Sequence, residues 1–187
     1  MAASKRFQEL RRPNEANATR SLPERAGWPL LAGDYHVLRY GASVAVCTLN
    51  SDDVASELAA ARPDGLAIVG SMHTENLGIE RVIRNISSNP HIRFLILCGD
   101  DTEQAIGHLP GQSLESLFRE GIDERQRIIG ARGKRPVLKN VSRAQIASFQ
   151  QQVELVPMIG ELLLYQLSYA RSREGHFTAS EASGEGN

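Results

Sequence analysis

Short apolar runs alternate with amphipathic stretches from residue 43 onward. The runs SVAVCTL, LAIVG and RFLILC are rich in β-branched residues and are bounded by turn residues, which is typical of buried strands. In the stretches between them, apolar side chains recur every three or four residues, as on one face of a helix. The predicted strands span 43–49, 66–70 and 93–98, with an edge strand at 127–129, and the predicted helices span 52–62, 77–88, 111–120 and 142–156.

This alternation of strand and helix predicts a parallel sheet with right-handed crossovers. We therefore expect an α/β fold with a Rossmann-like parallel sheet and helices on both faces, formed as a single domain by residues 27–170. The polar segment 1–26 is predicted to be a flexible leader. Residues 171–187 are mostly Ser, Gly and Glu with little to bury, and are predicted to be a disordered tail.

Composition narrows the class of protein. A net charge of −1 over 187 residues argues against a partner nucleic acid, whose phosphates require many cations. Each of the two cysteines ends an apolar run, so we expect buried thiols in a reducing compartment. The N-terminus lacks a secretory apolar region, and the apolar stretch 158–167 is shorter than the roughly 20 residues of a membrane span. These features predict a cytoplasmic protein without a membrane anchor.

The loop after the second predicted strand carries the first candidate for chemistry. Parallel sheets bind ligands beyond the carboxyl ends of their strands, and His73 stands there, in the loop 70–76. A neutral imidazole is a good ligand for cobalt or another transition metal. His73 has no partner at zinc-site spacing, but one histidine can supply the axial ligand that a corrin or haem leaves open. The competing interpretation is a loop histidine that bonds to the backbone.

The loop 99–112 is the second candidate. It carries acids, amides, glycines and His108, and a loop of this length is uncommon in a compact domain unless it is functional. The competing interpretation is a polar connection whose glycines only form turns. Asp100 and Asp101 are not favoured as a metal site, because adjacent side chains point apart. Residues 130–134 lack the spacing of a phosphate loop.

Five segments, in order, resemble the A subunit of tetrahydromethanopterin:coenzyme M methyltransferase. They are GWPLLAGDY (27–35), SVAVCTLNS (43–51), HTENLGIERVIRNISSNPHIRFLILCGDD (73–101), GHLPGQS (107–113) and GIDERQRIIGARGKRPVLKN (121–140). The resemblance implies a cobamide carrier, on which a methyl group passes from a methylated pterin to cobalt(I), and from methylcobalt(III) to the thiol of coenzyme M. It also implies that the axial histidine is His73, within HTENLGIE. The DxHxxG motif of other corrinoid proteins is absent.

We therefore predict a soluble cobalamin-binding protein that carries a methyl group on cobalt, with His73 as catalytic residue and metal ligand. Its expected partners are a pterin-binding methyltransferase subunit, which supplies the methyl group, and a methyl acceptor enzyme with a thiol or pterin acceptor, so it is not expected to be active alone. The predicted cofactor-binding residues are Thr48, Leu49, Asn50, Gly70, Ser71, Met72, His73, Thr74, Glu75, Asn76, Gly99, Asp100, His108, Leu109, Pro110, Gly111 and Gln112. The alternatives are a non-catalytic interaction or sensing module, and a small-molecule enzyme with His73 or His108 as acid–base.

Overall fold

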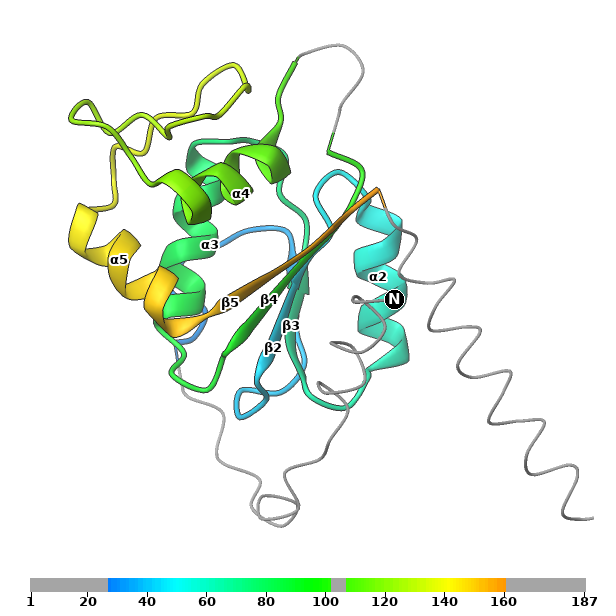
Figure 1. Ribbon diagram of the computed structural model, residues 1–187. Coiled ribbons are helices and arrows are strands. Elements are labelled where there is room, and N and C mark those ends of the chain that lie inside the picture. Colours follow the sequence, from blue (N-terminus) through cyan, green and yellow to red (C-terminus); the bar gives the residue numbers. More distant parts are fainter. Residues whose placement is uncertain (1–26, 102–106, 161–187) are drawn as a thin grey trace, which may run out of the picture.

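A five-stranded sheet forms the centre of the computed structural model, which describes residues 27–101 and 107–160 (Figure 1). The strand order is β1-β3-β2-β4-β5. Strands β2 to β5 are parallel, and β1 joins the edge antiparallel to β3. The strands are β1 (Tyr35–Val37), β2 (Val44–Cys47), β3 (Leu66–Gly70), β4 (Phe94–Gly99) and β5 (Glu154–Ile159).

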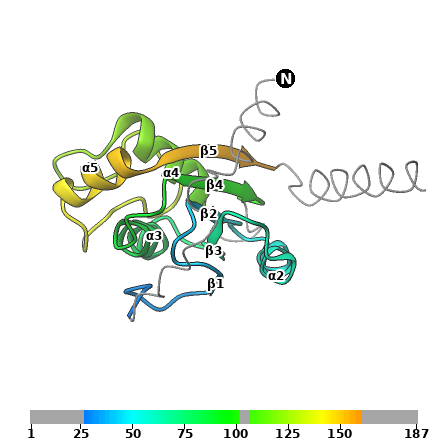
Figure 2. The ribbon, with the colours of Figure 1, turned by 90° about the horizontal axis from the view of Figure 1, so that it is seen from below.

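Helices cover both faces of this sheet, as predicted. Helix α2 lies on one face, and α3, α4 and α5 lie on the other (Figure 2). Alternate strand residues serve the two cores: in β4, Leu95 and Leu97 pack on the side of α3, while Ile96 and Cys98 pack on the side of α2. The helices are α2 (Asp52–Ala61), α3 (Leu77–Ser87), α4 (Pro110–Glu120) and α5 (Arg143–Gln152). The predicted α/β class is confirmed.

The prediction of one helix over 142–156 is wrong at its end. Helix α5 stops at Gln152, and Val153 is already extended, with φ −121° and ψ 142°. The following residues form β5, which among the described strands pairs with β4 alone. This strand contains Pro157, which an edge strand tolerates because one side of it is unpaired. The capping box at Ser142, by contrast, is present as predicted.

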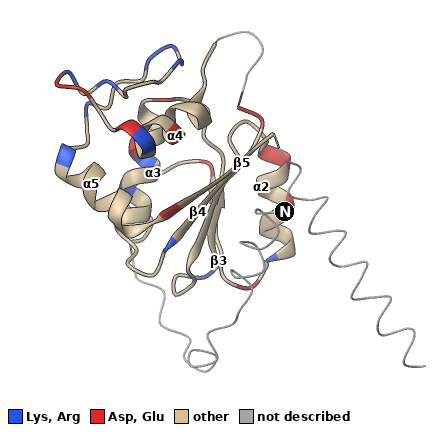
Figure 3. Ribbon diagram, in the orientation of Figure 1, with Lys and Arg blue, Asp and Glu red and all other residues tan. Residues whose placement is uncertain are grey.

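Two further differences concern short elements. The predicted edge strand 127–129 is not a strand: its residues form only the isolated bridges Ile122↔Ile128 and Arg127↔Val137. Strand β1 is not among the predicted elements, because three residues are too few to carry a period-2 pattern. The connection 121–142 between α4 and α5 is irregular and carries many basic side chains (Figure 3). The predicted leader and tail lie outside the described residues.

Both cysteines are buried, as their positions in the sequence predict. Cys47 ends β2 and is 3% exposed, and Cys98 in β4 is fully buried. Burial is the largest cause of the shift that raises the pKa of each thiol to about 12. Both cysteines are free thiols, and they take part in the two cores rather than in a disulfide.

Asn85 fastens the segment before β1 to helix α3. Its side-chain oxygen accepts from the N–H of Leu31 at 2.7 Å, and its amide nitrogen donates to the carbonyl of Leu31 at 2.9 Å. The indole N–H of Trp28 donates to the backbone carbonyl of Asn85 at 2.8 Å. Because Asn85 is only 6% exposed, it acts as a buried two-point clamp.

Replacing Asn85 with alanine is expected to lower the free energy of unfolding by about 2 kcal/mol, because it removes two hydrogen bonds of a buried side chain and leaves the N–H of Leu31 without this partner, while the Leu31 carbonyl keeps its bond from the Tyr35 hydroxyl. Urea denaturation followed by circular dichroism measures this. The exposed Arg81 on the same helix is the control, and Arg81→Ala should stay within about 0.5 kcal/mol. Equal midpoints for the two variants would contradict the clamp.

Candidate ligand-binding site

The strand order puts a topological switch point between β2 and β4. From β2 the chain crosses to β3 on one side, and β4 leads to β5 on the other side. In open α/β sheets, ligands bind in the crevice beyond the carboxyl ends of the strands at such a point. The loops that follow β2, β3 and β4 meet here. The N–H of Thr48 donates to the backbone carbonyl of Gly70 at 2.9 Å, and the N–H of Asn50 donates to the backbone carbonyl of Asp100 at 3.1 Å.

Gly99 lets the loops after β2 and β4 approach closely. Its φ is +83°, and a Cβ at this position would collide with the backbone carbonyl of Thr48 and with Ser51. The next residue, Asp100, donates its N–H to the Ser51 hydroxyl at 3.1 Å. Glycine therefore satisfies both the positive φ and the lack of space.

His73 lies at this edge, as predicted, with its side chain 35% exposed. Its Nδ1 is 2.9 Å from the side-chain oxygen of Asn50. The Asn50 amide nitrogen donates to Asp100 at 3.2 Å, so the oxygen must face the histidine and Nδ1 must carry a hydrogen. The other nitrogen, Nε2, lies 3.3 Å from a carboxylate oxygen of the exposed Asp52. Both ring nitrogens of His73 therefore face oxygen acceptors.

His108 is held by a different and stronger partner. Its Nδ1 is 2.5 Å from Oε2 of Glu75, and its side chain is 19% exposed. Glu75 is fully buried, and its Oε1 accepts from the N–H of Arg135 at 2.5 Å. An ionised carboxylate only accepts, so Nδ1 carries the hydrogen, and in the neutral ring the lone pair is then on Nε2. No hydrogen bond of Nε2 is found among the described residues.

The charge of Glu75 is set by opposing effects. Burial, the largest effect, acts to raise the pKa of this carboxyl. The hydrogen bonds from the backbone N–H groups of Arg135 and of Glu75 itself, together with the hydrogen bond and the electrostatic attraction of His108, act in the opposite direction and outweigh burial. The pKa of Glu75 is therefore below its ordinary value of 4.5, and the group is a carboxylate at neutral pH.

Gly133 gives the connection 121–142 access to Glu75. A Cβ on Gly133 would lie 2.8 Å from Oε1 of Glu75 and 3.2 Å from the hydroxyl of Ser113. Ser113 is buried, and its hydroxyl has no hydrogen-bond partner among the described residues. Residues 130–134 lack the spacing of a phosphate loop, and the role of Gly133 is a different one. It lets the backbone approach a buried carboxylate.

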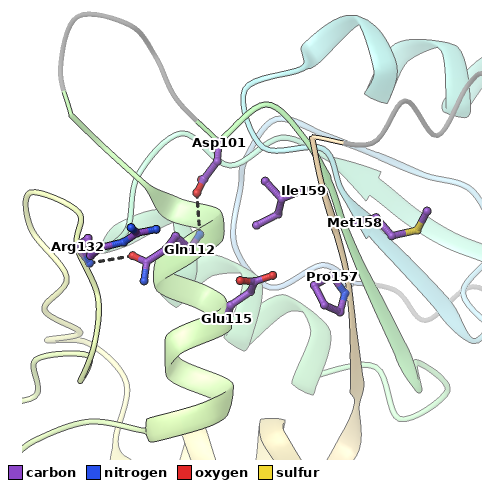
Figure 4. A pocket seen from close by; sticks show the side chains of 7 residues that line it. All are labelled: Asp101, Gln112, Glu115, Arg132, Pro157, Met158 and Ile159. Atoms are coloured by element: carbon purple, nitrogen blue, oxygen red, sulfur yellow. Dashed lines mark hydrogen bonds between the residues drawn. The ribbon is translucent and has the colours of Figure 1, made fainter. Parts of the chain in front are cut away.

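Asp101 closes the start of helix α4. Its two carboxylate oxygens accept from the N–H groups of Gly111 at 2.5 Å and Gln112 at 2.8 Å. Gln112 in turn accepts from the N–H of Arg132 at 2.8 Å, and these three side chains stand on one wall of a pocket of about 430 Å³ opposite Met158 (Figure 4). Burial, as the largest cause, raises the pKa of Asp101 above its ordinary 3.8.

The predicted contact residues divide by burial. Several pack into the interior rather than lining an open surface: Thr48, Leu49, Met72, Glu75, Pro110 and Gly111. The others are partly or fully exposed: Asn50, Gly70, Ser71, His73, Thr74, Asn76, Gly99, Asp100, His108, Leu109 and Gln112. Sequence reasoning missed four participants: Asp52, Asp101, Gly133 and Arg135. Asp101 lies within the predicted loop 99–112, where it is considered only as a metal ligand, and Asp52 begins the helix after the first predicted strand, but nothing local marks Gly133 or Arg135 as partners of Glu75.

Two absences among the described residues bear on the site. None of their helices is long and apolar enough to span a membrane. Within 27–101 and 107–160, no three histidine, cysteine or acidic side chains are grouped so that they could hold a metal ion.

A doubly wound sheet of this order, with an anchored histidine between β4 and α4, defines a single-domain α/β protein of a class in which ligands usually bind at the carboxyl edge of the sheet. The family model for the A subunit of tetrahydromethanopterin S-methyltransferase matches residues 22–168, and the chain belongs to this family. The predicted family is thereby confirmed.

Individual relatives agree with this assignment, and each is an A subunit of tetrahydromethanopterin S-methyltransferase. The one numbered 2 in Methanobrevibacter ruminantium is 46% identical over 138 residues, which are 73% of this chain and 68% of that protein. The one numbered 1 in the same organism is also 46% identical over 138 residues, 73% of this chain but 54% of its own length. The one numbered 1 in Methanothermobacter thermautotrophicus is 46% identical over 136 residues, 71% of this chain and 53% of that protein. The chain thus spans about half the length of the two relatives numbered 1.

Proposed function

We propose that this protein is a corrinoid carrier of a methyltransferase system, and that one histidine ligates the cobalt of a bound cobamide. The observation that carries the proposal is the pair formed by Glu75 and His108 beside the carboxyl edge of the sheet. Histidines that ligate metals nearly always donate their other N–H to a carboxylate or carbonyl, which fixes the tautomer and makes the ring a better ligand. When bound, the corrinoid supplies a cobalt atom that accepts and gives up a methyl group.

His108 fits the role of ligand better than His73. The fully buried carboxylate of Glu75 fixes the ring of His108 with a hydrogen on Nδ1, so that in the neutral ring Nε2 is the nitrogen that can bind a metal. The Nδ1 of His73 is held only by the neutral amide of Asn50, and its Nε2 faces the carboxylate of Asp52. His73 would have to leave Asp52 before it could bind a metal. The assignment of the ligand to His73 remains a prediction, and the geometry favours His108.

Each neighbour of His108 has a definable task. Glu75 holds the proton on Nδ1 and orients the ring. The N–H of Arg135 holds Oε1 of Glu75, so that Oε2 stays directed at the histidine. Asp101 fixes the first turn of α4, which begins two residues after His108. These contacts restrict the histidine before any ligand binds, which lowers the entropic cost of binding.

The test is reconstitution with hydroxocobalamin followed by absorption spectroscopy after gel filtration. We expect a coloured protein whose spectrum differs from that of free hydroxocobalamin, because a protein histidine ligates the cobalt. A colourless protein that does not retain cobalamin would contradict the proposal and favour a non-catalytic interaction or sensing module. A colourless protein that transforms a small substrate would favour an acid–base enzyme.

We expect the protein to be inactive alone and to work in the cytoplasm with a methyl acceptor enzyme and a pterin-binding methyltransferase subunit. Its relatives are named as subunits, which agrees with this division of labour. Mixing the reduced, corrinoid-loaded protein with methyltetrahydromethanopterin or methyltetrahydrofolate should give almost no methyl transfer. Adding a cognate pterin-binding subunit should give rapid transfer, measured by stopped-flow absorption. Fast transfer without a partner would show that this chain binds the pterin itself.

A further inference from the structure

A basic pocket of about 510 Å³ lies where the connection 121–142 meets the start of helix α3. Four cationic residues line it: Arg127, Lys134, Arg135 and Lys139. All four are partly or fully exposed, and the connection stands out as the most basic part of the described chain in Figure 3. Asparagines from both sides complete the polar lining, and no acidic residue contributes to it.

None of the four cationic side chains forms an ion pair within the described part of the protein. The ion pairs found in that part of the protein involve the side chains of Arg39, His73, His108 and Arg119, and none of these four residues lines the pocket. Like charges held close together repel one another, and an anion relieves that repulsion. Since the whole chain has a net charge of only −1, this local excess of positive charge is a property of the pocket and not of the protein as a whole.

The lining also includes apolar surface. Leu77, in the first turn of α3, is 53% exposed, and Val137 lines the same pocket. The volume lies in the range of roughly 300–1,000 Å³ that is usual for small-molecule sites. An anion attached to a planar apolar ring would use both parts of this surface. A phosphate ester of a nucleoside has that chemistry.

The pocket adjoins the proposed ligand site directly. Arg135, a lining residue, donates its N–H to Oε1 of Glu75, while His108 contacts Oε2 of the same carboxylate. Asn76, another lining residue, follows Glu75 in the chain. The histidine and the backbone of a pocket residue therefore contact the two oxygens of one buried carboxylate.

We propose that this pocket binds the phosphate of the nucleotide tail of the corrinoid, with the base of the tail against Leu77 and Val137. The proposal rests on the corrinoid-carrier function proposed above. Phosphate held by lysine and arginine is a charge-assisted interaction. It gives the tail a site of its own when the histidine, rather than the tail, ligates cobalt. A free nucleotide is the other source of the same chemistry.

The experiment compares cobalamin with cobinamide, which has the corrin ring but no phosphate or base. Calorimetric titration would use the full chain and the double variant Lys134→Ala/Lys139→Ala, which leaves Arg135 and its bond to Glu75 in place. We expect the double variant to bind cobalamin about tenfold more weakly and cobinamide equally well. The control, Arg81→Ala/Arg125→Ala, removes two exposed charges outside the pocket and should bind both as the full chain does.

The titrations with the different ligands distinguish failure of the proposed tail site from failure of the proposed carrier function. Equal affinity of the full chain for cobalamin and cobinamide overturns the tail site and leaves the carrier function intact. Failure of the full chain to bind either corrinoid overturns the carrier function, and with it the tail as occupant. Adenosine monophosphate is titrated as a third probe: if it binds, and the double variant loses that binding while cobalamin is unaffected, the pocket is a free-nucleotide site and the tail assignment is wrong.

Discussion

Replacing His108 with alanine is expected to remove histidine ligation from bound cobalamin, while His73→Ala retains it. The reason is that His108 alone combines an anchored Nδ1–H with an Nε2 that no described group occupies. Since affinity and spectrum both depend on the ligand, we expect binding to weaken by at least about tenfold in His108→Ala. Absorption spectra of the two reconstituted variants at equal protein concentration measure the difference.

The control for this experiment is structural. His108 is partly exposed and lies between β4 and α4, so its removal should leave the far-ultraviolet circular dichroism unchanged. The opposite pattern, with a changed spectrum in His73→Ala and none in His108→Ala, would establish His73 as the ligand. Unchanged spectra in both variants would rule out both histidines.

The conservative change Glu75→Gln is expected to disable the site nearly as completely. Glu75 accepts two hydrogen bonds, one from the backbone N–H of Arg135 and one from the Nδ1–H of His108. A glutamine can accept from only one of them through its oxygen. If the oxygen serves Arg135, the amide nitrogen faces Nδ1 and the ring proton moves to Nε2, which blocks metal binding. If the glutamine oxygen accepts from His108 instead, the Arg135 N–H faces the glutamine amide nitrogen, which is also a donor. Leaving this N–H unpaired costs about 1–3 kcal/mol of stability.

Two measurements distinguish these effects. The cobalamin spectrum of Glu75→Gln reports on ligation, and urea denaturation reports on stability. The lowered pKa of Glu75 adds a signature: the stability that this carboxylate contributes is fully present above its ordinary pKa of 4.5 and is lost as the pH falls below that value. The stability gap between the wild type and Glu75→Gln should therefore narrow on acidification. A gap that is independent of pH, with an unchanged spectrum, would contradict the assigned role.

Much of the fold follows from local pattern. The strands β2, β3 and β4 are continuous apolar runs, and α3 has the spacing of an amphipathic helix, so both are visible without tertiary information. Strand β5 is not, because it continues directly from α5 and contains Pro157. What makes residues 154–159 a strand is the free edge of β4, which exists only once the sheet is assembled.

The site follows from sequence only in part. Loop position after a strand located both histidines at the carboxyl edge, but it could not rank them. The ranking depends on Glu75, which lies 33 residues before His108 in sequence and is fully buried. Glutamate is almost never fully buried unless it is paired, so sequence alone gives no reason to expect this. The pairing needs Gly133 and Arg135 as well, which approach only through tertiary structure.

Because β5 is the last strand of the described fold, the sheet is incomplete for part of the time that the ribosome takes to synthesise the chain. Until residues 154–159 are synthesised, β4 has an unpaired edge that presents its backbone and the apolar side chains of a nascent domain. At ordinary rates of translation, the stretch from Gly99 to Glu154 takes on the order of several seconds. During that interval the unfinished sheet is open to pairing with other chains. Addition of β5 is the step that ends this exposure, and by then residues 75, 108 and 133–135 are all available to build the site.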